Sequence, residues 1–243
     1  MVFETCTSTN DVAEKSAHEG APHGFTAISE EQTAGRGRLG NTWTSPRGGI
    51  WITILLRAPS LTELLNSLSL IGSIAVAKII AANLNIPAKV RWPNDIIFEG
   101  RKVSGTLVQG KTKGNELEYA MLGIGINANF HTKLISNVAP AATTLLDILG
   151  HEVDREQLIS KLLSEIEYLS GLITKNDSKT VMDFLQQYEC SKGKRIKIKV
   201  PEREIVGVFR DYIGFTKVQL TTDKGERTTV DTAAVVSAEY VSL

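Results

Sequence analysis

The chain has 243 residues, of which 42% are hydrophobic and 22% are charged. This balance is ordinary for a globular protein with a buried core, and the length suffices for one large domain or for a large and a small one. Lysine plus arginine and aspartate plus glutamate both number 27, so no global charge favours nucleic acid or an anionic membrane.

The termini, cysteines and apolar segments indicate a cytoplasmic protein. The first residues, MVFETC, lack the basic and apolar regions of an export signal. Cys6 and Cys190 lie near opposite ends of the chain, so two free thiols in a reducing compartment are expected. The apolar segment 71–84 contains Lys78 and is too short to span a bilayer, so no membrane association is expected.

Helices and strands are both predicted along the first 189 residues. Ser8 is a candidate N-cap for a first helix that ends near Gly20. Ser60 and Glu63 form a capping box that opens the longest predicted helix. The apolar, β-branched segment 50–57 predicts a buried strand. Further strands are expected at 25–30, 90–92, 96–98, 103–109 and 117–126; the longest helix is expected at 61–84, and further helices at 154–173 and 179–189.

The pattern changes near Cys190. From Lys194 onward, short alternating segments are separated by glycines, and five short strands in about fifty residues predict a small β-barrel. We therefore expect two domains, residues 1–189 and 190–243. The predicted fold class is α+β, with a mixed β-sheet and flanking helices followed by the small barrel.

The most informative segment is QTAGRGRLG, residues 32–40. Its glycines let the backbone approach a ligand closely, and its arginines present planar forks of donors for carboxylates and phosphates. It also matches the dinucleotide motif GxGxxG, which must open a helix and be followed by an acidic residue about 20 positions later. The next residues, NTWTSPRGG, disfavour a helix, and no acidic residue occurs between Glu31 and Glu63. We therefore interpret the segment as a loop that surrounds an anion.

A second nucleotide motif is also rejected. Residues 105–112 (GTLVQGKT) match the P-loop pattern GxxxxGK[ST], which requires a phosphate-cradling loop followed by a helix. Leu107 and Val108 instead lie in a strand-like run, and Lys111 is followed by polar turn residues. A β-hairpin over 103–126 is the preferred interpretation.

Polar residues at the ends of predicted elements are further candidates, and each has a structural alternative. Asp95, in the segment RWPND, can orient a cation or bind Mg²⁺, or it can complete an Asx turn with Asn94. The stem of Lys102 is long enough to reach that turn, although a solvated turn lysine has the same signature. The strand end GIGIN presents small residues and Asn127, which suit a ligand or close strand packing. The helix start STN at 8–10 favours polar or anionic ligands, or only caps the helix.

Taken in order, these segments resemble the biotin–protein ligases. The resemblance rests on STN at 8–10, QTAGRGRLG at 32–40, RWPND at 91–95, RKVSGTL at 101–107 and GIGIN at 123–127. It implies a class II synthetase-like catalytic domain and a C-terminal SH3-like barrel. It also implies a two-step reaction, in which biotin and ATP give biotinyl-5′-AMP and a lysine of a biotin carboxyl carrier protein then takes the biotinyl group.

The resemblance assigns the site residues in three groups. Catalysis is assigned to Lys102, Arg36 and Arg38, whose charges would neutralise the biotin carboxylate and the α-phosphate. Biotin binding is assigned to Ser8, Thr9, Asn10, Gln32, Gly35, Arg36, Gly37, Arg38, Lys102, Gly105 and Leu107. ATP or adenylate binding is assigned to Arg36, Arg38, Trp43, Asn94, Asp95, Lys102 and Asn127.

The resemblance also sets expectations about partners. Biotin, ATP and the carrier protein are expected to bind. Mg²⁺ is expected to arrive with ATP, and the histidines show no metal-ligand spacing that would assign a protein-built metal site. Because STN begins at residue 8, we expect a monofunctional ligase that lacks an N-terminal DNA-binding domain. Relatives include monomers and homodimers, so the oligomeric state stays open. Leu39 and Arg91 replace residues that are often arginine and lysine in relatives.

Two other functions fit parts of the chain. A lipoate or octanoyl transferase has a similar catalytic fold, but the glycine–arginine loop and the C-terminal barrel favour biotin. The basic segment 192–199 (KGKRIKIK) is typical of a nucleic-acid-binding barrel or of a strand with a solvated lysine face. The balanced charge of the chain argues against nucleic acid.

Overall fold

The computed structural model describes residues 1–57, 61–113 and 116–241. Its larger sheet has the strand order β1-β2-β3-β7-β6-β5-β4, in which β1 and β2 are parallel and all other neighbours are antiparallel. The strands are β1 (Val2–Phe3), β2 (Thr26–Ser29), β3 (Ile50–Leu56), β4 (Lys89–Arg91), β5 (Asp95–Phe98), β6 (Arg101–Lys113) and β7 (Glu116–Ile126). The helices are α1 (Thr9–His18), α2 (Leu61–Leu84), α3 (Leu145–Leu149), α4 (Arg155–Thr174) and α5 (Ser178–Tyr188).

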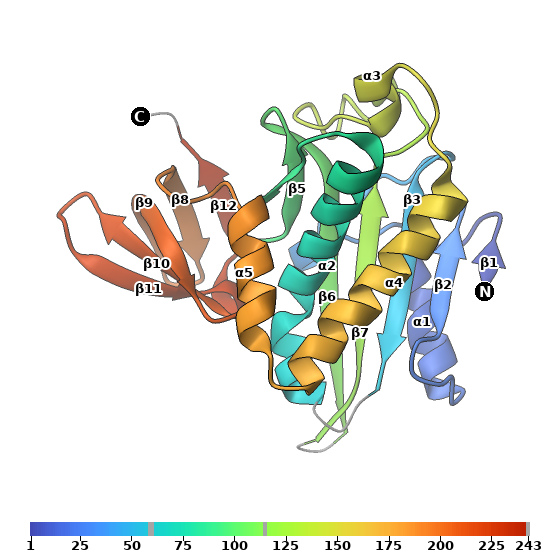
Figure 1. Ribbon diagram of the computed structural model, residues 1–243, viewed down its shortest axis with the longest axis horizontal. Helices are drawn as coiled ribbons and strands as arrows, with labels where there is room; N and C mark the ends of the chain where they lie inside the picture. Colours follow the sequence, from blue (N-terminus) through green and yellow to red (C-terminus); the bar gives the residue numbers. More distant parts are fainter. Residues whose placement is uncertain (58–60, 114–115, 242–243) are drawn as a thin grey trace.

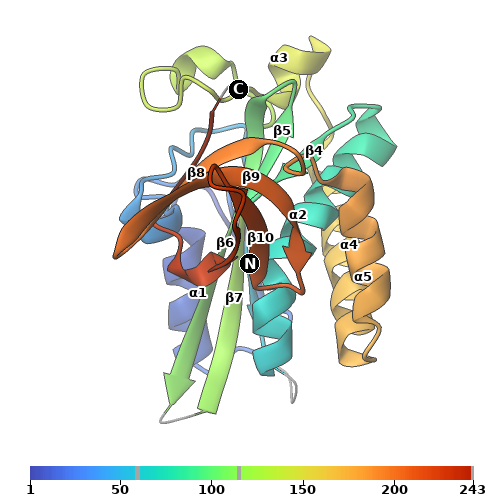
Figure 2. The same cartoon turned by 90° about the vertical axis from the view of Figure 1, so that its left-hand side faces the viewer.

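Helices cover both faces of the larger sheet, with α1 on one side and α2, α4 and α5 on the other (Figures 1 and 2). Because side chains alternate along a strand, the two faces of β3 bury different residues. Ile52 and Ile54 belong to the large core under α2, whereas Leu55 packs with Ala13 of α1. All seven residues of β3 are buried for this reason. Thr53 is the one polar residue among them, and it shares the α1 face.

Helix α2 lies at the centre of the core. Its segment Leu64–Leu84 is long and apolar enough to cross a membrane by length and composition, but 72% of its most apolar window is buried inside the protein. The apolar stretch therefore begins at Leu64 rather than at residue 71, where the sequence placed its start. Helix α2 packs as a core helix. The capping box predicted at Ser60 and Glu63 falls outside what the structure describes.

The C-terminal part of the chain forms a second, fully antiparallel sheet. Its strands have the order β11-β10-β9-β8-β12. They are β8 (Arg195–Val200), β9 (Arg203–Ile213), β10 (Lys217–Thr222), β11 (Arg227–Asp231) and β12 (Ser237–Tyr240). Trp92 joins the two sheets, because its ring packs against Phe209 of β9 with 5.9 Å between centroids. The predicted mixed α+β fold with a small C-terminal β domain is confirmed, while the division at residue 190 stays a prediction.

Most predicted elements occur where the sequence placed them. Ser8 caps α1 and accepts a hydrogen bond from the backbone of Asn10, as predicted. The hairpin of β6 and β7 is also confirmed, as are free thiols at Cys6 and Cys190. Strand β1 and helix α3 were not predicted, because two and five residues are too few to produce a periodic pattern.

Candidate active site

A cavity of about 320 Å³ lies between the start of α1, the glycine loop, strands β6 and β7, and the segment that enters β12. It collects most of the residues that the sequence assigned to the site. The predicted residues that line it are Thr9, Asn10, Gln32, Arg36, Gly37, Arg38, Trp43, Asn94, Asp95, Lys102, Gly105 and Leu107. Segments from four separate regions of the sequence therefore meet around one space.

The glycine loop is a hairpin-like flap over this cavity. Antiparallel bridges join Gln32 to Ser45 and Arg36 to Thr42. Only a three-residue 3₁₀ turn, Arg38–Gly40, occurs at its tip, so the loop does not open a helix as a dinucleotide motif must. The P-loop match fails in the same way, because its residues lie within β6.

The start of α1 carries a buried polar network into the cavity. Thr9 donates through its backbone N–H to Gln32 Oε1 at 2.7 Å, and its hydroxyl lies 2.8 Å from that of Thr53. Asn10 donates through Nδ2 to Gln109 Oε1 at 2.6 Å and accepts from Thr53 Oγ1 at 2.8 Å. These bonds fix both side-chain amides in orientation, which leaves a rigid, uncharged polar end to the cavity.

Three glycines of β6 and β7 form the flat floor of the cavity. A Cβ at Gly123 would lie 2.9 Å from Asn10 Oδ1, and one at Gly125 would lie 2.7 Å from Trp43 Nε1. A Cβ at Gly105 would meet both Trp43 and Lys102 at 3.1 Å. A side chain at Gly123 or Gly125 would displace Asn10 or Trp43, and one at Gly105 would press on Trp43 and Lys102, so glycine keeps these groups in place.

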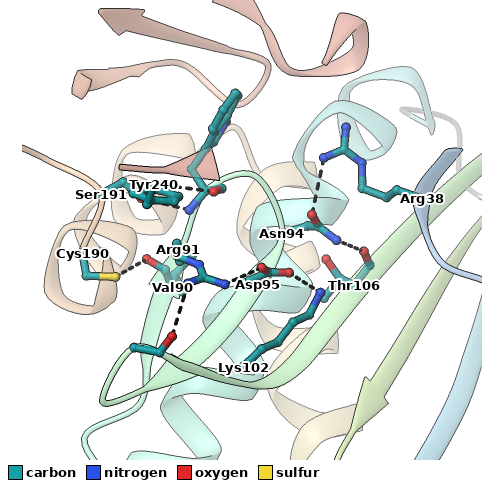
Figure 3. A network of polar contacts seen from close by, with 12 residues as sticks. Arg38, Val90, Arg91, Asn94, Asp95, Lys102, Thr106, Cys190, Ser191 and Tyr240 are labelled. Atoms are coloured by element: carbon teal, nitrogen blue, oxygen red, sulfur yellow. Dashed lines mark hydrogen bonds and ion pairs between the residues drawn. The ribbon is translucent and has the colours of Figure 1, made fainter. Parts of the chain in front are cut away.

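Lys102 and Asp95 form the charged end of the cavity (Figure 3). Lys102 Nζ lies 2.5 Å from Asp95 Oδ1, while Asp95 Oδ2 accepts from Arg91 at 3.0 Å. The β5–β6 register places Lys102 opposite Ile97, two positions beyond Asp95, and the lysine stem spans the difference, as predicted. Lys102 Nζ also lies 4.9 Å above the Trp43 ring. The ammonium is therefore held from two sides, by a carboxylate and by an aromatic face.

The two loop arginines point to different partners. Arg38 donates to Asn94 Oδ1 at 3.4 Å and to the backbone carbonyls of Thr232 and Val235 at 3.2 Å each. Burial lowers the pKa of Arg38, and the nearby Asp95 carboxylate opposes that shift. Arg36 is more exposed and pairs with Asp11 on α1. The connection between β11 and β12 thus holds one arginine of the flap directly.

Three predicted site residues do not line the cavity. Ser8 is fully buried as the helix cap. Gly35 lies in the outgoing strand of the flap and faces its returning strand, because a Cβ there would lie 2.3 Å from Trp43 O. Asn127 is buried and donates to the carbonyl of Thr143 at 3.0 Å, so its amide holds a loop. Their places in the structure indicate support of the site, and their predicted ligand contacts stay predictions.

Some residues that build the site were not predicted from the sequence. Thr53 and Gln109 contact Asn10; Thr53 interrupts the apolar strand β3, and Gln109 lies in the mixed polar and apolar strand β6. A single polar residue in a buried strand was the available signal for Thr53. The segment 235–238 lines the cavity from the C-terminal sheet. Its residues, VVSA, carry no sequence signal for a ligand site.

This arrangement defines a class of protein: an α+β domain with a glycine–arginine flap over one uncharged and one cationic subsite. Comparison with protein families then matches residues 2–127 to the biotin/lipoate A/B protein ligase family. Because the match covers more than half of the chain, the chain belongs to this family.

Known relatives and solved structures agree with that assignment. A biotin protein ligase from Aquifex aeolicus, solved in complex with biotin and ATP, is 25% identical, with a TM-score of 0.83 over 99% of this chain and 98% of that one. A biotin–[acetyl-CoA-carboxylase] ligase of Mycobacterium tuberculosis is 28% identical over 97% of this chain and 87% of its own length. The bifunctional ligase/repressor BirA of Bacillus spizizenii is 32% identical over 66% of this chain. The match spans 50% of that BirA protein, about half its length.

Proposed function

We propose that this protein is an ATP-dependent biotin–protein ligase. It activates biotin as biotinyl-5′-AMP and transfers the biotinyl group to a lysine of a biotin carboxyl carrier protein. The observation that carries the proposal is the cavity itself, in which a neutral amide-and-hydroxyl end faces a charged end that contains Lys102. Biotin has a matching shape, with a neutral ureido ring at one end and a carboxylate at the other.

The neutral end is the place for the biotin rings. The ureido group has two N–H donors and one carbonyl acceptor, and the amides and hydroxyls of Thr9, Asn10 and Gln32 offer both kinds of partner. The glycine floor allows the flat bicyclic ring to lie against the backbone. Gly105 and Leu107 would then border the valerate chain that leads to Lys102.

The charged end is the place for adenylate formation. Lys102 is a fixed positive charge where the biotin carboxylate meets the α-phosphate, and Asp95 keeps its ammonium in position. Arg38 lies across the cavity with Asn94 and remains cationic at physiological pH despite its lowered pKa. Trp43 offers an indole face for the adenine, and its buried N–H has no partner among the described residues. A ligand acceptor there would satisfy that donor.

The proposed reaction has two displacements. A carboxylate oxygen of biotin attacks the α-phosphorus of ATP, the bond to the bridging oxygen breaks, and pyrophosphate leaves with the electron pair. The neutral amine of the carrier lysine then attacks the acyl carbon, AMP leaves, and the nitrogen loses a proton to solvent. Lys102 and the flap arginines offset the negative charge that would otherwise keep the carboxylate from the phosphate. A closed flap protects the adenylate from water.

Mg²⁺ is proposed to enter with the phosphates of ATP. The described residues contain no cluster of three or more His, Cys, Asp or Glu side chains that could hold a metal. Both oxygens of Asp95 already bind cationic side chains, so this carboxylate is not free as a ligand. The side chains of this site therefore do not fit a protein-built metal centre, and no step of the mechanism depends on one.

The alternative of nucleic-acid binding has little support from the C-terminal sheet. Three of the five basic residues in segment 192–199, Lys192, Arg195 and Lys197, pair with Asp211, Asp223 and Glu204. Their charge is therefore neutralised locally, and the chain as a whole carries none. We propose a cytoplasmic enzyme with a catalytic domain at 1–189 and a β domain at 190–243 whose segment 235–238 completes the site.

The test is transfer to a carrier protein. The chain is incubated with ATP, Mg²⁺, a biotin carboxyl carrier domain and either biotin or lipoic acid, and the carrier mass is measured. We expect a mass gain of one biotinyl group only with biotin and ATP together. A carrier domain whose target lysine is replaced by arginine is the matched control and should gain nothing. Lipoyl transfer without biotinyl transfer would refute the proposal in favour of the lipoate branch of the family.

A further inference from the structure

The flap is closed at its base by a stem in which Gln32 lines the cavity and Ser45 does not. At this stem, Gln32 and Ser45 form an antiparallel bridge, and Gln32 N donates to Ser45 O at 3.0 Å. Trp43 N donates to Gly35 O at 2.8 Å, so the returning strand of the flap is tied to its outgoing strand. A Cβ at Gly35 would lie 2.6 Å from Ser45 Oγ, which shows how closely the flap backbone rests on this serine.

Ser45 is the link between the polar end of the cavity and Trp43. It is 3% exposed and does not line the cavity. Its Oγ accepts from Gln32 Nε2 at 2.8 Å and donates to the carbonyl of Trp43 at 2.9 Å. With the bonds described above, hydrogen bonds run without interruption through Asn10, Thr53, Thr9, Gln32, Ser45 and Trp43.

At its Thr9 and Thr53 end, this chain of bonds has fewer hydroxyl protons than acceptors. Thr9 and Thr53 supply one hydroxyl proton each. The acceptors within reach are Asn10 Oδ1 at 2.8 Å, the partner hydroxyl at 2.8 Å, and Gln32 Oε1 at 3.1 Å. A ligand that donates to Asn10 or binds the Thr9 hydroxyl releases one of these protons and rearranges the rest. The rearrangement changes the hydrogen bonding of Gln32, because Gln32 Oε1 is one of the acceptors and Gln32 Nε2 binds Ser45.

We propose that Ser45 is a positioning residue that couples ligand binding at Thr9 and Asn10 to closure of the glycine flap and to the placement of Trp43. The inference rests on the proposed function, since it takes biotin as the ligand at Thr9 and Asn10. Biotin binding stabilises the Gln32–Ser45 contact that the structure shows, which holds the Trp43 carbonyl in place and prepares the nucleotide end of the cavity. Ser45 does this without touching either ligand.

The experiment measures how much biotin tightens nucleotide binding. The probe is α,β-methylene-ATP, which cannot release pyrophosphate and therefore cannot form the adenylate. Its dissociation constant is measured by calorimetry with and without saturating biotin, and the ratio is the coupling factor. We expect a ratio well above one for the wild-type chain and a ratio at least fivefold smaller for Ser45→Ala. Ser45→Thr, which keeps the hydroxyl, should restore the wild-type ratio.

Thr44→Ala is the matched control, because it removes one hydroxyl from the adjacent, exposed residue. Its ratio should equal that of the wild type. An unchanged ratio in Ser45→Ala, or a wild-type ratio of one, would overturn the inference. The proposed function would still stand in either case, provided that the wild-type chain binds biotin. A wild-type chain that binds no biotin would overturn both together.

Hydrogen exchange on the wild-type chain gives a second test that needs no variant to fold. Biotin alone should slow exchange of the flap amides of Gly37 and Trp43, which donate to Asn41 O and Gly35 O within the flap. Unchanged exchange at both amides under saturating biotin would overturn the coupling.

Discussion

Replacement of Lys102 separates a catalytic charge from a binding contact. Lys102→Ala removes an ammonium that is 28% exposed and lies 2.5 Å from Asp95. Asp95 keeps its bond to Arg91 at 3.0 Å, so the carboxylate is not left unpaired and the fold should tolerate the change at a cost of about 1 kcal/mol. Loss of one oriented charge at the reacting centre should lower the rate of adenylate formation by about 10²–10³-fold, or about 2.7–4 kcal/mol.

Biotin affinity should change much less in this variant. The ureido partners at Thr9, Asn10 and Gln32 lie at the opposite end of the cavity and are untouched. Biotin-dependent exchange of labelled pyrophosphate into ATP measures adenylate formation, and calorimetry measures biotin affinity. Lys102→Arg is the control that keeps the charge but changes its geometry. Its exchange rate should fall between those of the wild type and Lys102→Ala. Equal losses of exchange rate and of affinity in Lys102→Ala would refute the catalytic role.

Arg38→Gly should release the flap from the two C-terminal carbonyls, so free biotinyl-AMP should leak and label bystander lysines; label confined to the carrier would count against this role. Gly125→Ala should displace Trp43 and weaken nucleotide binding about tenfold with biotin affinity retained, whereas Gly171→Ala, in open space on α4, should leave both affinities unchanged; calorimetry decides. Asp147→Asn should lower the free energy of unfolding at pH 7 by about 1–2 kcal/mol, measured by urea titration.

The pH dependence of the Asp147 effect has a defined sign. Burial alone would raise the pKa of this carboxyl, but hydrogen bonds from Thr132 and His131 outweigh it and lower the pKa from 3.8 to about 2. A lowered pKa stabilises the fold above pH 4, and that contribution is lost as the pH falls towards 2. The difference between wild type and Asp147→Asn should therefore shrink between pH 4 and pH 2. A constant difference across that range would contradict the assignment.

Local signals in the sequence were enough for much of the fold. The Ser8 cap, the apolar run of β3 and the β6–β7 hairpin each depend on neighbouring residues, so capping chemistry and periodicity predict them. The Lys102–Asp95 contact was also within reach, because the two residues lie in adjacent strands joined by a short turn.

Contacts between distant segments were not predictable in this way. Arg38 binds the carbonyls of Thr232 and Val235, and a backbone carbonyl has no side-chain identity that a sequence can reveal. Ser45 presents one buried hydroxyl whose importance depends on Gln32, thirteen positions earlier. Asn127 matched a motif for ligand binding, yet its amide is held by a neighbouring loop. In each case tertiary packing decides what the side chain does.

The most direct measurement is exchange of labelled pyrophosphate into ATP by the purified chain, with the acid substrate as the only variable. The proposed ligase activity predicts rapid exchange with biotin, none without an acid, and loss of exchange in Lys102→Ala while biotin still binds. Exchange that is independent of biotin, or that is supported by lipoic acid but not by biotin, would contradict it.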